Sequence, residues 1–338
     1  MNRIILNHLN FNYQEIYFYW FQHSMKEQYS PLVPSEQSKE MWFTNSKKYD
    51  SKIVSKFNVL YEISDNRKHI TRIDKTINFM ISTYQKLVPV FNQKKDAYYQ
   101  FGNLFTYYND RMLRIYQTNK YYDIIKESKK DLIQNLRKYH YENFRKFLEL
   151  TPNYEVIYHK LKDYTEINFH ISFDDLFFDL FFCKHIILTN IILYDQFSRI
   201  IKRNTKESYK YDYVTKTFSE KLMELDIRHL IYLFTPTEFM FLMLPFQHYE
   251  DKTLDTVFLA LQNTENYEKE FKLKHRNFVY YSKKNNYADF FKELSYHNRG
   301  HYDVLSRFGR YPKRNQIMGR LSTPDENTYI RLTPNIPY

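Results

Sequence analysis

Polar side chains in apolar surroundings mark two places in the chain where acid–base chemistry could occur. Asp195 and Arg199 lie in the apolar segment IILYDQFSRII, one helical turn apart and therefore on one face of a helix. In the segment FLMLPFQHYED, His248 and Glu250 follow Pro245, at which a helix should kink or end. Histidine and carboxylate side chains commonly serve as general bases. We therefore treat His248 and Glu250 as candidate catalytic bases.

A third polar cluster lies near the C-terminus, in residues 299–326. It holds three of the four glycines of the chain, which predicts tight turns or close backbone approaches there. Arginines stand between these glycines, and their fork of N–H donors suits a carboxylate or a phosphate. An alternative stays open, in which these arginines hold helix ends and loop carbonyls or pair with acids such as Asp195 and Glu250. The candidate ligand-binding residues are Asp195, Arg199, Arg307, Arg310, Arg314 and Asn315, and His301 is a further candidate catalytic residue.

The three clusters should meet in the folded protein. Asp195 has apolar neighbours, and a buried carboxylate without a partner costs several kcal/mol. We therefore predict an ion pair between Asp195 and one arginine of the C-terminal cluster. The candidates are Arg307, Arg310 and Arg314, with His248 and Glu250 lining the same region and His301 nearby.

Several other chemistries lack the residues that they need. The single cysteine, Cys183, rules out disulfides within the chain and zinc sites built from several cysteines. The four glycines form neither a GxGxxG nor a GxxxxGK[ST] phosphate-binding loop. His297 and His301 have the spacing of two metal ligands, but Gly300 disfavours a helix there and no glutamate completes an HExxH motif. We predict no metal site and no cofactor.

Helix signals dominate the elements that must position these side chains. Segments 235–238 and 323–326 each read Thr-Pro-x-Glu, which predicts an N-cap, a proline at the first helical position and a glutamate that returns to the cap. Ser172 and Thr151 mark two more helix starts. Apolar residues recur every three or four positions over 184–203, which predicts a long buried helix. Alternating strand patterns and Asn-Gly or Asp-Gly hairpin turns are lacking, so we predict an all-α chain.

Longer motifs resemble a known family. DQFSR at 195–199, LPFQHYED at 244–251 and HYDVLSRFGRYPKRNQIMGRLSTPDE at 301–326 look like motifs of the family called domain of unknown function 924. The resemblance covers roughly residues 15–58 and 173–330, and it implies a helical, tetratricopeptide-like fold with no established activity. Near the N-terminus it rests on FYWF at 18–21 and on Trp42, Phe43, Asp50, Ile53 and Phe57.

The chain departs from the family's pattern at positions that bear on activity. Ser198, Ile200 and Asn204 stand where the family usually has proline, asparagine and glycine. Tyr249 stands in place of a serine, and Lys313 in place of a common histidine. The resemblance implies that an activity depending on that serine or histidine is lost here.

The resemblance also suggests a division of the chain. Residues 1–59 are predicted to be the N-terminal part of a family-like core, and residues 171–338 its main part with the Arg- and Gly-rich motif. Residues 60–170 form a predicted helical insertion that packs on the core as an added block, so that its deletion leaves the rest folded. Residues 262–296 predict a second polar insertion or a long connection.

Charge and hydropathy suggest where the protein resides. The chain has 50 Lys and Arg against 39 Asp and Glu and a net charge of +11. The basic residues are spread along a composition rich in Lys, Asn, Ile, Tyr and Phe, so we favour the bias of an AT-rich genome, as in some protists and giant DNA viruses, over a nucleic-acid partner. No secretory signal opens the chain, and polar residues or proline interrupt the apolar segments 177–193 and 231–246. We predict buried helices, no membrane association and a cytoplasmic protein, or one of the host cytoplasm or virion if it is viral.

Two functional hypotheses follow. We favour a tetratricopeptide-like interaction module, in which stacked helices offer a groove to a protein or peptide and the polar clusters hold helices in register. The alternative is a small-molecule enzyme or sensor that binds an anionic carboxylate or phosphate ligand. In the alternative, His248 or Glu250 is the general base and the arginines clamp the anion.

Overall fold

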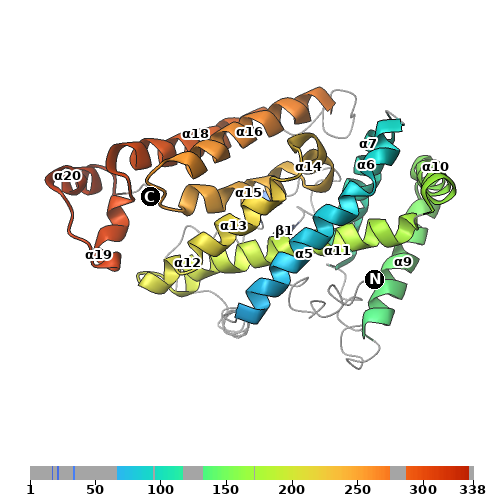
Figure 1. The fold of residues 1–338 in the computed structure, drawn as a ribbon, viewed down its shortest axis with the longest axis horizontal. Helices are drawn as coiled ribbons and strands as arrows, with labels where there is room; N and C mark the ends of the chain where they lie inside the picture. Colours follow the sequence, from blue (N-terminus) through green and yellow to red (C-terminus); the bar gives the residue numbers. More distant parts are fainter. Residues whose placement is uncertain are drawn as a thin grey trace. The chain divides into compact units, whose positions relative to one another are not determined.

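The computed structural model describes residues 17, 21–22, 33–34, 67–93, 96–116, 132–170, 172–274 and 287–334. Helices dominate this part of the chain (Figure 1), which confirms the all-α prediction. The strands described are β1 (Phe21–Gln22) and β2 (Val33–Pro34), which pair antiparallel. A tetratricopeptide-like arrangement of the helices stays a prediction. The family-like residues Trp42, Phe43, Asp50, Ile53 and Phe57 lie outside the described residues.

The chain divides into two compact units. The first comprises Met1–Thr44, Asp65–Asn190 and Glu224–Glu238, and the second comprises Asn45–Ser64, Ile191–Met223 and Phe239–Tyr338. The predicted domain boundaries at residues 59 and 170 are not decided by this division and stay predictions.

Aromatic side chains build the core of the first unit. Phe177 of α11 lies against Phe105 of α7 and Phe144 of α9, with ring centroids 5.3 Å and 5.0 Å apart. Gly102 lets α7 approach α14, because a Cβ at this position would come within 2.2 Å of the Tyr232 ring. The described helices of this unit are α5 (Arg67–Gln85), α6 (Val88–Gln93), α7 (Ala97–Tyr116), α9 (Leu132–Glu149), α10 (Pro152–Phe169), α11 (Phe173–Ile191) up to residue 190, and α14 (Ile227–Leu233).

The second unit holds the three polar clusters. Its helices α16 and α18 pack side by side, and a small apolar core of Val257, Val304, Leu305 and Tyr311 lies where α18 ends. Its described helices are η1 (Ile192–Phe197), α12 (Ser198–Ile201), η2 (Lys206–Tyr209), α13 (Asp212–Leu222), α15 (Pro236–His248) from residue 239, α16 (Asp255–Lys274), α18 (Tyr287–Phe308), η3 (Pro312–Arg314), α19 (Asn315–Met318) and α20 (Pro324–Leu332).

The four predicted helix starts are confirmed. Thr323 and Glu326 form a reciprocal capping box at the start of α20. At α15 the N–H of Glu238 donates to Thr235 Oγ1 at 3.3 Å, and the N–H of Thr235 donates to Glu238 Oε2 at 2.8 Å. Helices α11 and α10 begin directly after Ser172 and Thr151, although the Thr151 hydroxyl donates to the carbonyl of the preceding helix instead of capping α10.

The predicted long helix over 184–203 is present, but it is not α-helical throughout. Residues Ile192–Phe197 form a π-helix between α11 and α12. Among the described residues, one stretch, Phe173–Ile201, is long and apolar enough to cross a membrane by length and composition. All of the window that meets this test is buried inside the protein, as in the core helix of a soluble protein, so the evidence for a membrane segment is weak.

Three predictions of local structure need correction. Gly300 lies inside α18, so the helix is continuous there, whereas the turns expected at glycines occur at Gly309 and Gly319, both with φ of +67°. Pro245 lies inside α15, which continues to His248, so the helix does not end at this proline, and a kink there stays a prediction. Residues 262–274 and 287–296 are helical parts of α16 and α18 and not a connection, and residues 275–286 lie outside the described part.

Candidate functional site

A buried carboxylate and a histidine form the centre of the site. Asp195 lies in the π-helix η1 and is fully buried, and His248 is the last residue of α15. His248 Nδ1 lies 2.8 Å and 2.9 Å from the two carboxylate oxygens of Asp195. Burial opposes ionisation of Asp195, but His248 and Arg199 outweigh it and lower its pKa to about 2. A carboxylate only accepts hydrogen bonds, so Nδ1 of His248 must carry the proton between them.

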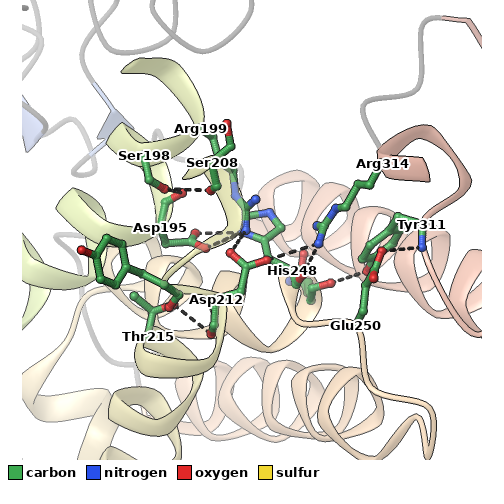
Figure 2. A network of polar contacts seen from close by, with 12 residues as sticks. Asp195, Ser198, Arg199, Ser208, Asp212, Thr215, His248, Glu250, Tyr311 and Arg314 are labelled. Carbon is green, nitrogen blue, oxygen red and sulfur yellow. Dashed lines mark hydrogen bonds and ion pairs between the residues drawn. The ribbon is translucent and has the colours of Figure 1, made fainter. Parts of the chain in front are cut away.

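Two arginines and a second aspartate extend this centre. Arg199 Nη2 lies 3.2 Å from Asp195 Oδ1 and 2.6 Å from Asp212 Oδ1. Arg314 Nη1 lies 3.2 Å from Asp212 Oδ2 and donates to the carbonyl of His248 at 2.9 Å. Figure 2 shows that Asp212, the first residue of α13, receives both arginines, while Asp195 faces His248. We call Asp195, Arg199, Asp212, His248 and Arg314 the central cluster.

Aromatic rings fix the orientation of Arg314. Its guanidinium carbon lies 4.5 Å from the ring centroid of Tyr209 and 4.3 Å from that of Tyr311. Arg199 also lies over Tyr209, at 5.2 Å. The contacts with both rings and the two hydrogen bonds at Nη1 leave the Arg314 guanidinium little freedom to rotate.

A separate set of ion pairs holds the C-terminal segment. Arg320 binds both oxygens of Glu250, at 2.6 Å and 3.0 Å, and the N–H of Tyr311 donates to Glu250 Oε1 at 2.9 Å. Arg310 binds Glu326 through Nε at 2.7 Å and Nη2 at 2.9 Å. These contacts are the structural pairings that the alternative interpretation of the arginines described, and they leave Glu250 occupied.

His301 lies beside the central cluster in a hydrogen-bonded chain. The hydroxyl of Tyr311 donates to the carbonyl of Gln247, so the contact of 2.9 Å between Tyr311 and His301 Nδ1 requires the imidazole to donate. The rings of His301 and His248 are 5.7 Å apart. Burial, followed by the charge that His248 carries when protonated and by the charge of Arg314, holds the pKa of His301 well below its usual value, so that His301 is neutral.

The structure brings together most of the predicted site residues, but it changes their partners. Asp195 pairs with Arg199 and His248, and the predicted ion pair with Arg307, Arg310 or Arg314 is wrong, because Asp212 separates Arg314 from Asp195. Arg307 is exposed over the Phe308 ring. Arg310 binds Glu326, and Asn315 Nδ2 donates to the same carboxylate at 3.1 Å.

Sequence reasoning missed Asp212, Tyr209 and Arg320. An aspartate in the first turn of a helix is ordinarily an exposed residue that favours the helix N-terminus, so nothing in the sequence marked Asp212 as buried. The tyrosine content of the chain, 34 residues, hid Tyr209 among many others. Arg320 lies in the Arg-rich segment that the sequence singled out, but nothing in the sequence distinguished it from the other arginines as the partner of Glu250.

The part of the chain that the structure describes contains no group of three or more His, Cys, Asp or Glu side chains placed to hold a metal ion. In the central cluster the two carboxylates are instead bound to the arginines and to His248.

Comparisons with known proteins add a family to this geometry. The profile of a family described as "Bacterial protein of unknown function (DUF924)" matches residues 165–333, half of the chain. A solved structure of a protein of unknown function from Agrobacterium tumefaciens, ATU0120, is similar with 26% identity over 44% of this chain and 69% of that chain, at a TM-score of 0.31. No protein with a curated description matches. These comparisons lend no support to the viral or protist origin suggested by composition. The resemblance noted in the sequence is thereby confirmed, and the chain belongs to the DUF924 family.

Proposed function

We propose that the central cluster is a small-molecule site in which Asp195 orients His248 as a proton acceptor toward an anionic ligand. The observation that carries the proposal is the contact of His248 Nδ1 with both oxygens of a fully buried Asp195. Because Nδ1 holds its proton, Nε2 presents a lone pair. Nε2 has no hydrogen-bond partner among the described residues, and the His248 side chain is 15% exposed. A carboxylate that orients an imidazole in this way also raises its basicity.

The free energy that is needed to bury the charges of the central cluster supports a functional role. Four charged side chains there have lost most of their hydration, and well-packed apolar residues of similar volume often give equal or greater stability than buried ion pairs. The π-helix that carries Asp195 is a rare element that occurs frequently at functional sites.

The neutral state of His248 suits a proton acceptor. Burial lowers its pKa, and Arg199 adds to this effect, while Asp195 and Asp212 oppose it. The imidazole is therefore unprotonated near neutral pH and available to accept a proton.

A thermal-shift screen of small carboxylates and phosphates tests the proposal. A specific ligand stabilises the folded state by mass action, so we expect a rise in Tm for the wild-type protein. The rise should be lost in His248→Gln, while Glu207→Gln, in an exposed ion pair with Lys210, should respond as the wild type does. An equal response of His248→Gln to every ligand found would contradict the proposal, and so would the absence of any ligand.

A protein-binding role is the second candidate. The observation that favours it is the exposure of two adjacent apolar side chains on α16, Phe258 at 54% and Leu259 at 37%. A photo-crosslinking side chain at position 258 should then capture one discrete partner in cells, and the same side chain at Lys252 should not. Equal labelling from both positions would argue against a specific surface.

A further inference from the structure

One edge of the Arg314 guanidinium is unused. Both of its hydrogen bonds, to Asp212 and to the carbonyl of His248, come from Nη1. Nε and Nη2 make no hydrogen bond within the described part of the chain, and neither is among the atoms that are buried without a partner. The residue as a whole is only 9% exposed, so a mostly buried cation keeps two donors for a partner from solution.

Another arginine of this protein shows what a guanidinium edge formed by Nε and Nη2 can bind. Arg310 uses its Nε and Nη2 to hold both oxygens of the Glu326 carboxylate, at 2.7 Å and 2.9 Å. Two parallel N–H donors at this spacing match the two oxygens of a carboxylate or phosphate. In Arg314 the same edge is held in a fixed orientation by the rings of Tyr209 and Tyr311, but no carboxylate of the described residues occupies it.

The charges of the central cluster determine what an added anion does. Asp195 and Asp212 carry two negative charges, and Arg199 and Arg314 carry two positive charges, so the cluster is neutral when His248 is neutral. An anion on Arg314 makes this poorly hydrated cluster negative unless a proton is added. The groups that face His248 are Asp195 from η1, Arg199 from α12, Asp212 from α13, His301 from α18 and Arg314 from η3. Glu250, beyond the end of α15, interacts with Arg314 and Arg320. Among these, His301 is held neutral. Asp195 and Asp212 are ion-paired, and although burial raises the pKa of Asp212, a carboxyl group starts from an ordinary pKa well below that of histidine. This leaves His248 to take up the proton.

We propose that an oxyanion binds in a bidentate manner to the Nε and Nη2 edge of Arg314 and that His248 takes up one proton when it binds. The proposal rests on the function proposed above and deepens it, because it names the receptor, the class of ligand and a regulation by pH. Carboxylates and phosphate monoesters share the required pair of oxygens.

The sign of the pH dependence follows from linkage. The anion raises the pKa of His248, so binding is strongest below the pKa of the free protein and weakens as the pH rises through the pKa of the complex. Between these two values the dissociation constant rises by up to about tenfold per pH unit, for one proton taken up.

The test is a titration of His248 in the full-length protein by NMR of the histidine Cε1–H groups. The His248 signal is identified by its absence in His248→Asn. Sulfate keeps its charge throughout the range from about pH 5 to about pH 8 in which histidines titrate, so sodium sulfate is compared with sodium chloride at equal ionic strength. We expect sulfate to raise the pKa of His248 by about one unit. Sodium acetate serves as a planar probe beside the tetrahedral sulfate. The anion with the smaller dissociation constant shows which of the two geometries the Arg314 edge prefers.

Variants locate the anion. Arg314→Gln should abolish the pKa shift, and Arg314→Lys, which keeps the charge but not the fork, should weaken it. Arg307→Gln removes the same charge from an exposed position and should leave the shift intact. A shift that persists in Arg314→Gln would place the anion elsewhere and overturn the proposal.

Two further results would overturn this inference without overturning the proposed function. In the first, sulfate perturbs the Arg314 side-chain signals while the pKa of His248 stays constant, so that binding takes up no proton. In the second, neither sulfate nor acetate perturbs these signals, although a ligand from the thermal-shift screen still requires His248. Failure of the proposed function is distinct, since it shows as a screen in which His248→Gln changes nothing.

Discussion

At the scale of single residues, Asp195 contributes stability through the charges that it balances. Asp195→Ala leaves Arg199 and Arg314 with only Asp212 as a buried counterion. We expect a loss of about 3 kcal/mol in the free energy of unfolding, measured by urea denaturation. The matched control is Glu207→Ala, in an exposed ion pair with Lys210, which should cost less than about 0.5 kcal/mol. Equal losses of unfolding free energy in the two variants would show that the central cluster is not a network of buried charges.

The stability of the fold at low pH should also depend on Asp195. The folded-state pKa of Asp195, about 2, is below the ordinary value of 3.8, so its contribution is present above pH 3.8 and lost as the pH falls toward 2. In the wild type, the free energy of unfolding should fall by about 2 kcal/mol over this pH range because Asp195 becomes protonated. Asp195→Asn has no carboxylate to protonate, so we expect this decrease to be absent from the variant. If unfolding free energies measured between these pH values fell in parallel for the two proteins, the ionisation of Asp195 would not be the source of the acid sensitivity.

Residue types and spacing could predict which side chains gather, but not which pairs form. Asp195, Arg199, His248 and Arg314 were recognisable as charges that apolar neighbours would force into contact. Asp195 pairs with Arg199 and not with Arg314 because Asp212 binds Arg314. Asp212 is buried because η1 packs against α13, and the neighbouring sequence does not indicate this burial.

At the scale of elements, capping patterns predicted helix starts well because the signal is local. The predicted starts at 152, 173, 236 and 324 coincide with the observed helices. The break expected at Gly300 did not occur, since a glycine costs only about 1 kcal/mol inside a helix and the packing of α18 against α16 outweighs it. The π-helix at Ile192–Phe197 was not predictable, because apolar residues every three or four positions predict a helix but do not distinguish a π-helical turn from an α-helical one.

Gly102 provides a test of helix packing in the first unit. Alanine favours helices over glycine, so intrinsic propensity predicts that Gly102→Ala stabilises α7. The Cβ would instead lie 2.2 Å from Cδ1 of Tyr232 in α14, and overpacking of this kind costs about 2 kcal/mol. We expect a lower midpoint of thermal unfolding. A higher midpoint would mean that α7 and α14 are not in close contact.

At the scale of the whole molecule, the resemblance identified the family, whereas the domain boundaries stay predictions. The idea that residues 60–170 form a removable block can be tested by deleting them. Phe177 and Phe181 of α11 lie against Phe105 and Tyr108, which the deletion removes. We therefore expect the deletion variant to lose the cooperative unfolding of the first unit, measured by circular dichroism on heating. Full retention of a cooperative transition would support the added block predicted from the sequence.

The proposed function depends on Asp195 holding His248 with its proton on Nδ1 and a lone pair on Nε2. The most direct measurement is nitrogen-15 NMR of the His248 ring in the full-length protein, at a pH above the pKa of His248. We expect a protonated Nδ1 and an unprotonated Nε2 in the wild type, and a shift toward the other tautomer in Asp195→Ala. A wild-type His248 with its proton on Nε2, or with the two tautomers in rapid exchange, would contradict it.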